Sequence, residues 1–206
     1  MAVPLLQVDQ LAKQYTRGLF NKRVTFSLGA DFRVDEPQVI GVMGPNGSGK
    51  TTLFELITGS NLPTAGRVLV NGQDIHQVRT RERDRLAIHY HQSYQVRSFQ
   101  RSKPNFMLDH AHSDSPMVHL FDEPQFNTQD GYIGFMLDFF ARLKEQGKLV
   151  FLCLHPNEPY HVDILRQACE RFIFVQKGVV TQAPDFDTLA REPAVRTYLG
   201  ALAPTQ

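Results

Sequence analysis

Residues 44–51 combine glycine, lysine and threonine at the spacing of a phosphate-binding loop. They read Gly44-Pro45-Asn46-Gly47-Ser48-Gly49-Lys50-Thr51 and fit the pattern G-x-x-x-x-G-K-[ST]. Glycines let the backbone approach an anion closely, so that successive amides can surround a phosphate at a helix N-terminus. Lys50 would contact the β- and γ-phosphates of a nucleotide, and Thr51 would offer its hydroxyl to Mg²⁺. A glycine-rich turn with a chance lysine is the alternative, but every fixed position of the pattern is present.

A pair of acidic residues supplies the second half of such a site. The segment Met117–Phe121 reads as a buried strand that ends in the apolar Leu120 and Phe121, and Asp122 and Glu123 follow it directly. Asp122 would hold Mg²⁺, directly or through water. Glu123 would act as the general base that takes a proton from an attacking water. An acidic pair at a strand end is weak evidence alone, but it is strong evidence when a phosphate-binding loop precedes it.

The elements around these residues indicate an α/β fold with a mainly parallel central sheet and helices on both faces. Apolar runs at 39–43, 149–154 and 171–175 read as buried strands. The segment 52–57 after the loop reads as a helix, and Gly131–Gln146 is the clearest amphipathic helix, with Gly147 as its C-terminal stop. Strands alternating with helices predict a parallel sheet covered on both sides.

Shorter strands are expected before the loop and just after its helix. Leu5–Val8 and Val24–Leu28 read as short strands, and Asn71-Gly72 predicts a tight hairpin after Arg67–Val70. Tyr15 lies between the first two strands. Its ring could stack on a purine base, or it could simply pack against the protein.

The bulk composition restricts the class of protein. A length of 206 residues suits one α/β domain, so we expect a single domain over residues 1–206. The formal net charge of +1 gives no general attraction to nucleic acid. Two cysteines, of which Cys153 lies in an apolar run, suit a reducing compartment. No signal peptide or membrane span is recognisable, so we expect a cytoplasmic protein whose membrane role, if any, comes through a partner at the inner face.

Residues 44–52, which end in Thr52, and residues 120–124 together resemble the motifs of the ATP-binding cassette (ABC) ATPase family. The resemblance implies the P-loop NTPase fold of that family, with an N-terminal antiparallel β portion. It also implies ATP and Mg²⁺ as cofactors and ATP hydrolysis as the activity. A second ABC ATPase subunit and a membrane permease subunit are the partners it implies, and nucleic acid is not among them.

The family resemblance also assigns roles to single residues outside the two motifs. Tyr15 matches the aromatic residue that stacks on adenine, and Gln92 matches the glutamine that reaches Mg²⁺ and water. His155 matches the histidine that contacts the γ-phosphate. Its position at the carboxyl end of a central strand supports this role independently, because parallel sheets bind ligands there. Asp130 approximates the family's aspartate loop, although the segment before it is about one residue longer.

The sequence departs from the family between Ser93 and Pro116. Members carry a helical subdomain and a serine-glycine-glycine signature there, whereas this interval is short and has Gln100 and Arg101 where the two glycines belong. Glycine permits the close backbone approach to a partner's γ-phosphate, so that contact is expected to be lost. The hypothesis that follows is a heterodimer in which another cassette subunit supplies an intact signature. A regulatory ABC module with slow or no turnover is the alternative.

Three other interpretations have less support in the sequence. His89, His91, His110 and His112 repeat one spacing, and four imidazoles could hold zinc, but their spacing matches no known zinc site. A cassette protein that acts on DNA or ribosomes is expected to carry a basic segment, and this sequence has none. A small-molecule kinase would not need the acidic pair at 122–123, which favours water as the nucleophile.

Overall fold

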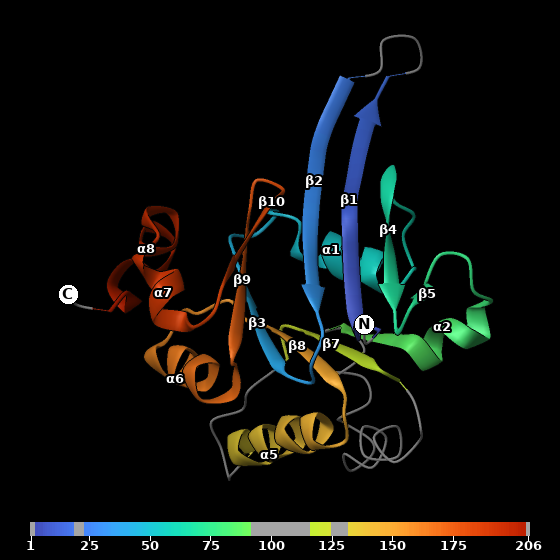
Figure 1. The fold of residues 1–206 in the computed structure, drawn as a ribbon. Coiled ribbons are helices and arrows are strands. Elements are labelled where there is room, and N and C mark those ends of the chain that lie inside the picture. Colours follow the sequence, from blue (N-terminus) through green and yellow to red (C-terminus); the bar gives the residue numbers. More distant parts are fainter. Residues whose placement is uncertain (1–2, 19–22, 92–115, 125–131, 205–206) are drawn as a thin grey trace.

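The computed structural model describes residues 3–18, 23–91, 116–124 and 132–204. Within these residues, ten strands form one mixed sheet in the order β5-β4-β1-β2-β10-β9-β3-β8-β7-β6. The predicted α/β class is confirmed, and so is the division into a parallel portion and an antiparallel portion that includes the N-terminal strands. Figure 1 shows the long β1 and β2 strands rising above the rest of the sheet.

The parallel portion of the sheet supplies the ends on which the site is built. Its strands are β6 (Ala87–His91), β7 (Val118–Asp122), β8 (Leu149–Cys153), β3 (Val39–Met43) and β9 (Arg171–Gln176). Each pairs in parallel with its neighbour in that order. Every residue of β3, β7 and β8 is buried, which explains the continuous apolar runs of β3 and β8.

Two separate layers of side chains cover the two faces of these strands. Successive residues of a strand point to opposite faces, so Val42 packs in one layer and Met43 in the other. The first layer contains the apolar side of α1 (Lys50–Ile57) together with β1, β2 and β4. The second layer is formed by four helices, which are α5 (Tyr132–Glu145), α6 (Pro159–Ala168), α7 (Phe186–Arg191) and α8 (Pro193–Leu199). The prediction of helices on both faces is confirmed (Figure 1).

The antiparallel portion of the sheet is longer than the sequence indicated. It consists of β1 (Leu6–Arg17), β2 (Arg23–Val34), β4 (Ala65–Val70), β5 (Gln73–Asp74) and β10 (Val179–Ala183). The expectation of two short strands was wrong, because β1 and β2 each span 12 residues. Their outer ends are mostly exposed and polar, and a register shift lies between Val8 and Leu11 where Gln10 has a positive φ of 44°. Such a bulge interrupts the alternation by which a strand is recognised.

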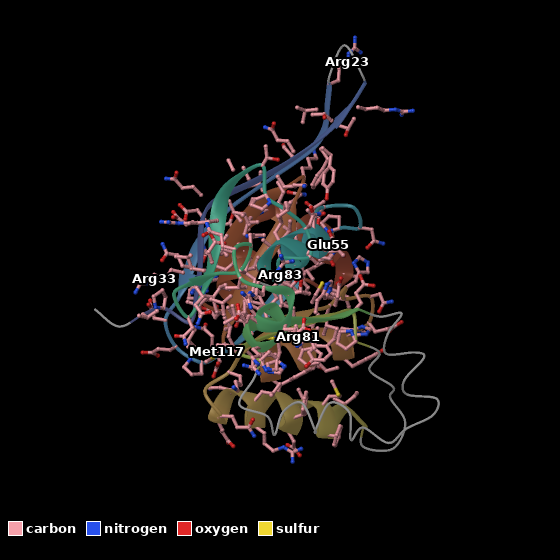
Figure 2. The ribbon with its side chains drawn as sticks, turned by 90° about the vertical axis from the view of Figure 1, so that its right-hand side faces the viewer. Arg23, Arg33, Glu55, Arg81, Arg83 and Met117 are labelled. Atoms are coloured by element: carbon pink, nitrogen blue, oxygen red, sulfur yellow. The ribbon has the colours of Figure 1, made fainter. Side chains whose placement is uncertain are left out.

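The hairpin of β1 and β2 projects away from the remainder of the chain. Figure 2 shows Arg23 at its far end, distant from Arg81, Arg83 and Met117. The short helix α2 (Thr80–Leu86) precedes β6 and lies away from the far end of this hairpin, and the 3₁₀ turn Gly200–Leu202 follows α8.

Local turn predictions are confirmed where the residue type dictates the backbone. Asn71 and Gly72 have φ of 49° and 77°, the two positive values that a tight β4–β5 hairpin needs. Gly147 ends α5 with φ of 79°. No helix in the described ranges is long and apolar enough to cross a membrane.

Candidate nucleotide site

The glycine-rich loop joins the end of β3 to the start of α1, as the pattern predicts. Gly44 has φ of 149°, and a Cβ at this position would lie 2.0 Å from the backbone oxygen of Val175 on the adjacent strand β9. No other residue fits there. The loop is also fastened from outside, since the Gly178 amide donates to the Ser48 carbonyl at 2.9 Å. The sheet therefore fixes the path of the loop before any ligand binds.

Lys50 occupies the first turn of α1 and is held inside the loop. Its side chain is buried with 6% of its surface exposed. The Nζ atom donates to the backbone oxygens of Gly44 at 2.7 Å and Pro45 at 3.0 Å. The loop thus has a cation at its centre and amides at the N-terminus of a helix, the combination that attracts phosphate.

The acidic strand end contacts the loop helix directly. The Thr51 hydroxyl donates to Asp122 Oδ2 at 3.0 Å, and His89 Nε2 lies 3.3 Å from the same oxygen. Burial acts to raise the pKa of Asp122, but the hydrogen bonds from His89 and Thr51 and the charge of His89 outweigh it and lower the pKa. Asp122 is therefore a carboxylate at neutral pH. A hydroxyl and a carboxylate are the oxygen donors that Mg²⁺ prefers, so this pair fits the predicted metal.

Glu123 follows Asp122 in a left-handed backbone conformation, with φ of 50°. Its amide donates to the Cys153 carbonyl of the neighbouring strand β8 at 3.0 Å. A non-glycine residue rarely adopts this conformation, and such strain is concentrated at functional sites. The turn places Glu123 immediately beyond the carboxyl end of the strand that carries Asp122.

His155 lies two residues beyond β8, the strand between β3 and β7 in the sheet. Its side chain is half-buried, and its Nδ1 atom is 2.8 Å from the hydroxyl of Tyr198 on α8. The phosphate-binding loop, the acidic pair and His155 therefore follow the carboxyl ends of three adjacent parallel strands, where α/β sheets bind ligands.

Tyr15 lies on β1 and not between two strands. It is 38% exposed and directly opposite Phe26 in the β1–β2 register, with their ring centroids 6.2 Å apart. Phe26 approaches the glycine-rich loop, because a Cβ on Gly49 would meet its ring at 2.9 Å. The exposed ring of Tyr15 therefore lies next to Phe26, which in turn contacts the glycine-rich loop at Gly49.

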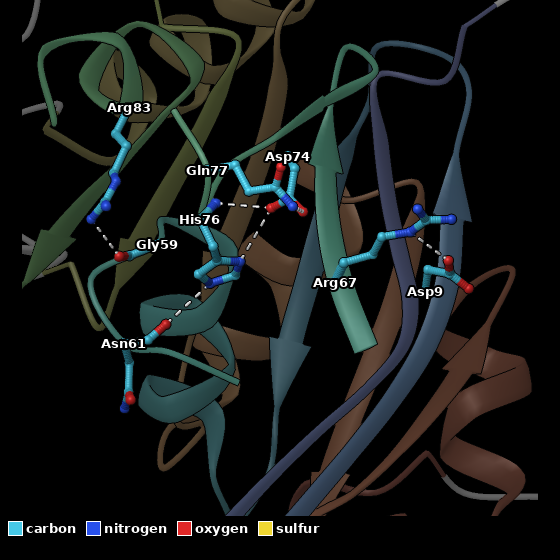
Figure 3. A network of polar contacts seen from close by, with 8 residues as sticks. All are labelled: Asp9, Gly59, Asn61, Arg67, Asp74, His76, Gln77 and Arg83. Atoms are coloured by element: carbon cyan, nitrogen blue, oxygen red, sulfur yellow. Dashed lines mark hydrogen bonds and ion pairs between the residues drawn. The ribbon is translucent and has the colours of Figure 1, made fainter. Parts of the chain in front are cut away.

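A polar network anchors the loop after α1 and reaches Tyr15. The Asn61 amide nitrogen donates to the Tyr15 hydroxyl at 2.7 Å and to Glu55 Oε2 at 3.0 Å. Figure 3 shows the Asn61 carbonyl next to His76, whose Nε2 lies 3.1 Å away, and Arg83 donating to the Gly59 carbonyl at 2.8 Å. Asn61 is held by Glu55 through its side chain and by His76 through its carbonyl, and its amide in turn positions the Tyr15 hydroxyl.

Several of the predicted residues lie outside the described ranges. These are Gln92, Asp130, and the interval after Gln92 that contains Gln100, Arg101, His110 and His112. The register of β6 with β7 nevertheless sets His91 opposite Asp122, one residue before Gln92. The described residues contain no group of three or more His, Cys, Asp or Glu side chains that could hold a metal ion. His89, one of the four histidines considered for zinc, contacts Asp122.

Three contacts at this site were missed from the sequence. His89, Asn61 and Tyr198 contact Asp122, Tyr15 and His155 respectively, over separations of 33, 46 and 43 residues. No spacing rule links such distant positions. The alternation of side chains along a strand gave a partial indication for His89 alone. It predicts to which face of the sheet His89 points, but not that this strand lies beside the one that carries Asp122.

Comparison with known proteins agrees with the motifs. Residues 28–128 match the ABC transporter family. Over 84 residues the chain is 33% identical to the spermidine/putrescine import ATP-binding protein PotA of Legionella pneumophila, covering 41% of this chain and 21% of PotA. Over 79 residues it is 37% identical to the lipoprotein-releasing system ATP-binding protein LolD of Colwellia psychrerythraea, covering 38% of this chain and 30% of LolD.

The fold has a solved counterpart across most of its length. The dimeric post-hydrolysis structure of the ATP-binding cassette MJ0796, bound to ADP and Pi, superposes with a TM-score of 0.66 at 16% identity, covering 87% of this chain and 98% of that chain. The chain thus has the P-loop fold of ABC ATPases, and its similarity to the ABC transporter family lies in residues 28–128. The matched stretches span less than a third of the curated relatives.

Proposed function

We propose that this chain binds ATP with Mg²⁺ and hydrolyses it, as the ATP-binding subunit of an ABC-type transport complex. The observation that carries the proposal is the 3.0 Å hydrogen bond from Thr51 to Asp122, which joins the phosphate-binding loop to the acidic strand end. These segments are 71 residues apart in the sequence. Their junction beside a buried Lys50 is the arrangement that nucleotide hydrolysis by a P-loop protein requires.

The binding roles follow from the chemistry of the side chains. Residues 44–52 would surround the phosphates with amides, and the Lys50 ammonium would turn from the loop carbonyls to the β- and γ-phosphates. Thr51, Asp122 and Gln92 would hold Mg²⁺, which when bound neutralises charge on the phosphate oxygens. The exposed ring of Tyr15 would stack on the adenine.

The catalytic roles fall to residues at the strand ends. Glu123 would accept the proton of the attacking water, and Gln92 would orient that water. His155 would donate a hydrogen bond to the γ-phosphate, and together with Lys50 it would stabilise the charge that develops there. Glu123 and His155 lie just beyond the paired strands β7 and β8, so the sheet would hold these two residues in place without reorganisation.

The partners are inferred from the motifs that the chain has and lacks. We propose a single domain over residues 1–206 that pairs with a second ABC ATPase subunit, because the segment 93–116 is too short for the family's helical subdomain. A heterodimer is favoured, since a partner with an intact glycine signature would complete the site of this chain. A membrane permease subunit would then hold the pair at the cytoplasmic face of the membrane.

The test measures ATP hydrolysis by the purified chain, alone and with a second ABC ATPase subunit that carries an intact serine-glycine-glycine signature. We expect MgATP binding in both cases, hydrolysis only with the partner, and loss of hydrolysis with retained binding in Glu123→Gln. Glu145→Gln, an exposed acid on α5, is the matched control and should behave as the wild type. Absence of MgATP binding would overturn the function. Full hydrolysis by the chain alone would overturn the need for a partner.

A further inference from the structure

A tyrosine from the C-terminal helix α8 reaches the centre of the proposed site. Tyr198 is half-buried, and its hydroxyl is 2.8 Å from His155 Nδ1. Its ring packs against the His155 ring with centroids 5.5 Å apart at 65°, and against Phe174 of β9 at the same centroid distance. The ring is therefore fixed on two sides, and its hydroxyl is directed at one particular nitrogen of His155.

The surroundings of the hydroxyl determine which group donates. Burial is the main cause that raises the pKa of Tyr198, and the charge of Glu123 raises it further. Tyr198 therefore keeps its proton at neutral pH. Among the described residues, His155 Nδ1 is the hydrogen-bond partner of this hydroxyl, so the O–H bond is available to donate to that nitrogen.

A histidine that accepts at Nδ1 must carry its proton on Nε2 when it is neutral. We propose that Tyr198 is a positioning residue that holds His155 in the Nε2–H tautomer, with an N–H donor directed away from α8. This inference rests on the proposed function, in which His155 donates to the γ-phosphate. The other tautomer would present a lone pair to a phosphate oxygen and repel it.

The arrangement also ties His155 to the core through one side chain. The Tyr198 ring packs against Phe174 of β9, and its hydroxyl contacts His155 just beyond β8. Helix α8 packs in the layer that covers β3 and β9, so it is held by the core and not by the nucleotide. The donor on His155 is thereby oriented before ATP binds, which is how metal sites and catalytic sites orient their histidines.

The test compares Tyr198→Phe with the wild type by ¹⁵N NMR of histidine-labelled protein, with His155→Gln used to assign the resonances. We expect His155 in the Nε2–H form in the wild type and a mixture of both tautomers in Tyr198→Phe. Tyr160→Phe is the matched control, because Tyr160 lies on α6 with its ring 4.1 Å from that of another histidine, His161. It should leave the His155 signals unchanged. An Nδ1–H form in the wild type, or an unchanged Nε2–H form in Tyr198→Phe, would overturn the inference.

Kinetics with the partner subunit supply a second readout. Loss of one neutral hydrogen bond to His155 should lower kcat by about five- to tenfold with KM for ATP nearly unchanged. In a His155→Gln background the same substitution should have no further effect. A changed tautomer with an unchanged kcat would overturn the positioning role. If the wild type shows no hydrolysis, the proposed function fails, whereas the wild-type NMR spectrum still decides the tautomer.

Discussion

Glu123 combines a proposed chemical role with an unfavourable backbone conformation. Its φ of 50° is a conformation that glycine adopts freely and other residues do not. We therefore expect Glu123→Gly to be more stable than Glu123→Ala by about 0.5–1 kcal/mol, because only glycine relieves the strain. Denaturant unfolding of both variants measures this difference, and both should lack hydrolysis.

The same pair of substitutions at Glu145 provides the control. Glu145 ends α5 in an ordinary helical position, where alanine should be more stable than glycine. The order of the two variants should thus be opposite at the two sites. An alanine variant that is the more stable at both positions would show that the backbone of Glu123 is not strained.

Tyr15 offers a second prediction at the residue scale. If its exposed ring stacks on adenine, Tyr15→Ala should weaken MgATP binding by about 1–3 kcal/mol, roughly 5- to 150-fold in Kd. Tyr15→Phe keeps the ring and loses the contact with Asn61, so its effect should be smaller. Isothermal titration calorimetry with ATP and with inorganic tripolyphosphate separates the contribution of the adenine from that of the phosphates, because tripolyphosphate has no base. An equal loss of affinity for both ligands would contradict stacking.

The residues that the sequence identified and the ones it missed differ in a physical way. Lys50 and Thr51 were predictable because the loop needs its residues at fixed short spacings, and Asp122 because an acid directly follows an apolar strand. Tyr198 was not predictable, because a helix can bring a tyrosine to His155 from any distance along the chain. Only the packing of α8 against β9 specifies that contact.

At the scale of elements, buried segments were predicted well and exposed ones poorly. The β3, β7 and β8 strands are buried at every position, so the sequences of β3 and β8 are apolar throughout and that of β7 is apolar except for His119 and Asp122. The outer part of β1 pairs with β2 although both are largely exposed there. Backbone hydrogen bonds hold that hairpin together, and they leave little trace in residue type.

The connection between α1 and α2 gives a pH-dependent prediction for an element. Burial is the largest influence on His76 and lowers its pKa below 6.5, although hydrogen bonding to Asn61 and the charge of Asp74 raise it. The unfolded chain therefore binds more protons than the folded chain between the two pKa values. Stability should fall as the pH drops below about 6.5, and the loss should stop below the folded pKa.

His76→Gln keeps a polar group near the Asn61 carbonyl and removes the titration. Its free energy of unfolding should depend less on pH between about pH 7 and pH 5 than that of the wild type. His161, whose pKa is also lowered mainly by burial, contributes a loss of the same sign that remains in the variant. Parallel pH profiles for the two proteins, measured by urea unfolding, would show that His76 does not contribute.

For the whole molecule, one sheet supports both layers of the core. β3, β8 and β9 each contribute side chains to the layer around α1 and to the layer under α5, α6, α7 and α8. Because the same strands carry side chains of both layers, unfolding of these strands would expose the apolar side chains of both layers at once. The ten strands of the sheet should therefore unfold as one cooperative unit, with equal calorimetric and van't Hoff enthalpies.

Nucleotide binding at the end of this sheet should stabilise that whole unit. At MgATP concentrations of about 100 times Kd, linkage adds about 2.7 kcal/mol to the free energy of unfolding. The gain should appear as an upward shift of the single transition, because loop 44–51 directly follows β3 and Asp122 ends β7, and both strands lie within the sheet. Lys50→Ala should abolish the shift, while Lys148→Ala, which alters a lysine before β8 outside the proposed site, should retain it. A separate early transition that alone responds to MgATP would show that the site is an independently folding part of the chain.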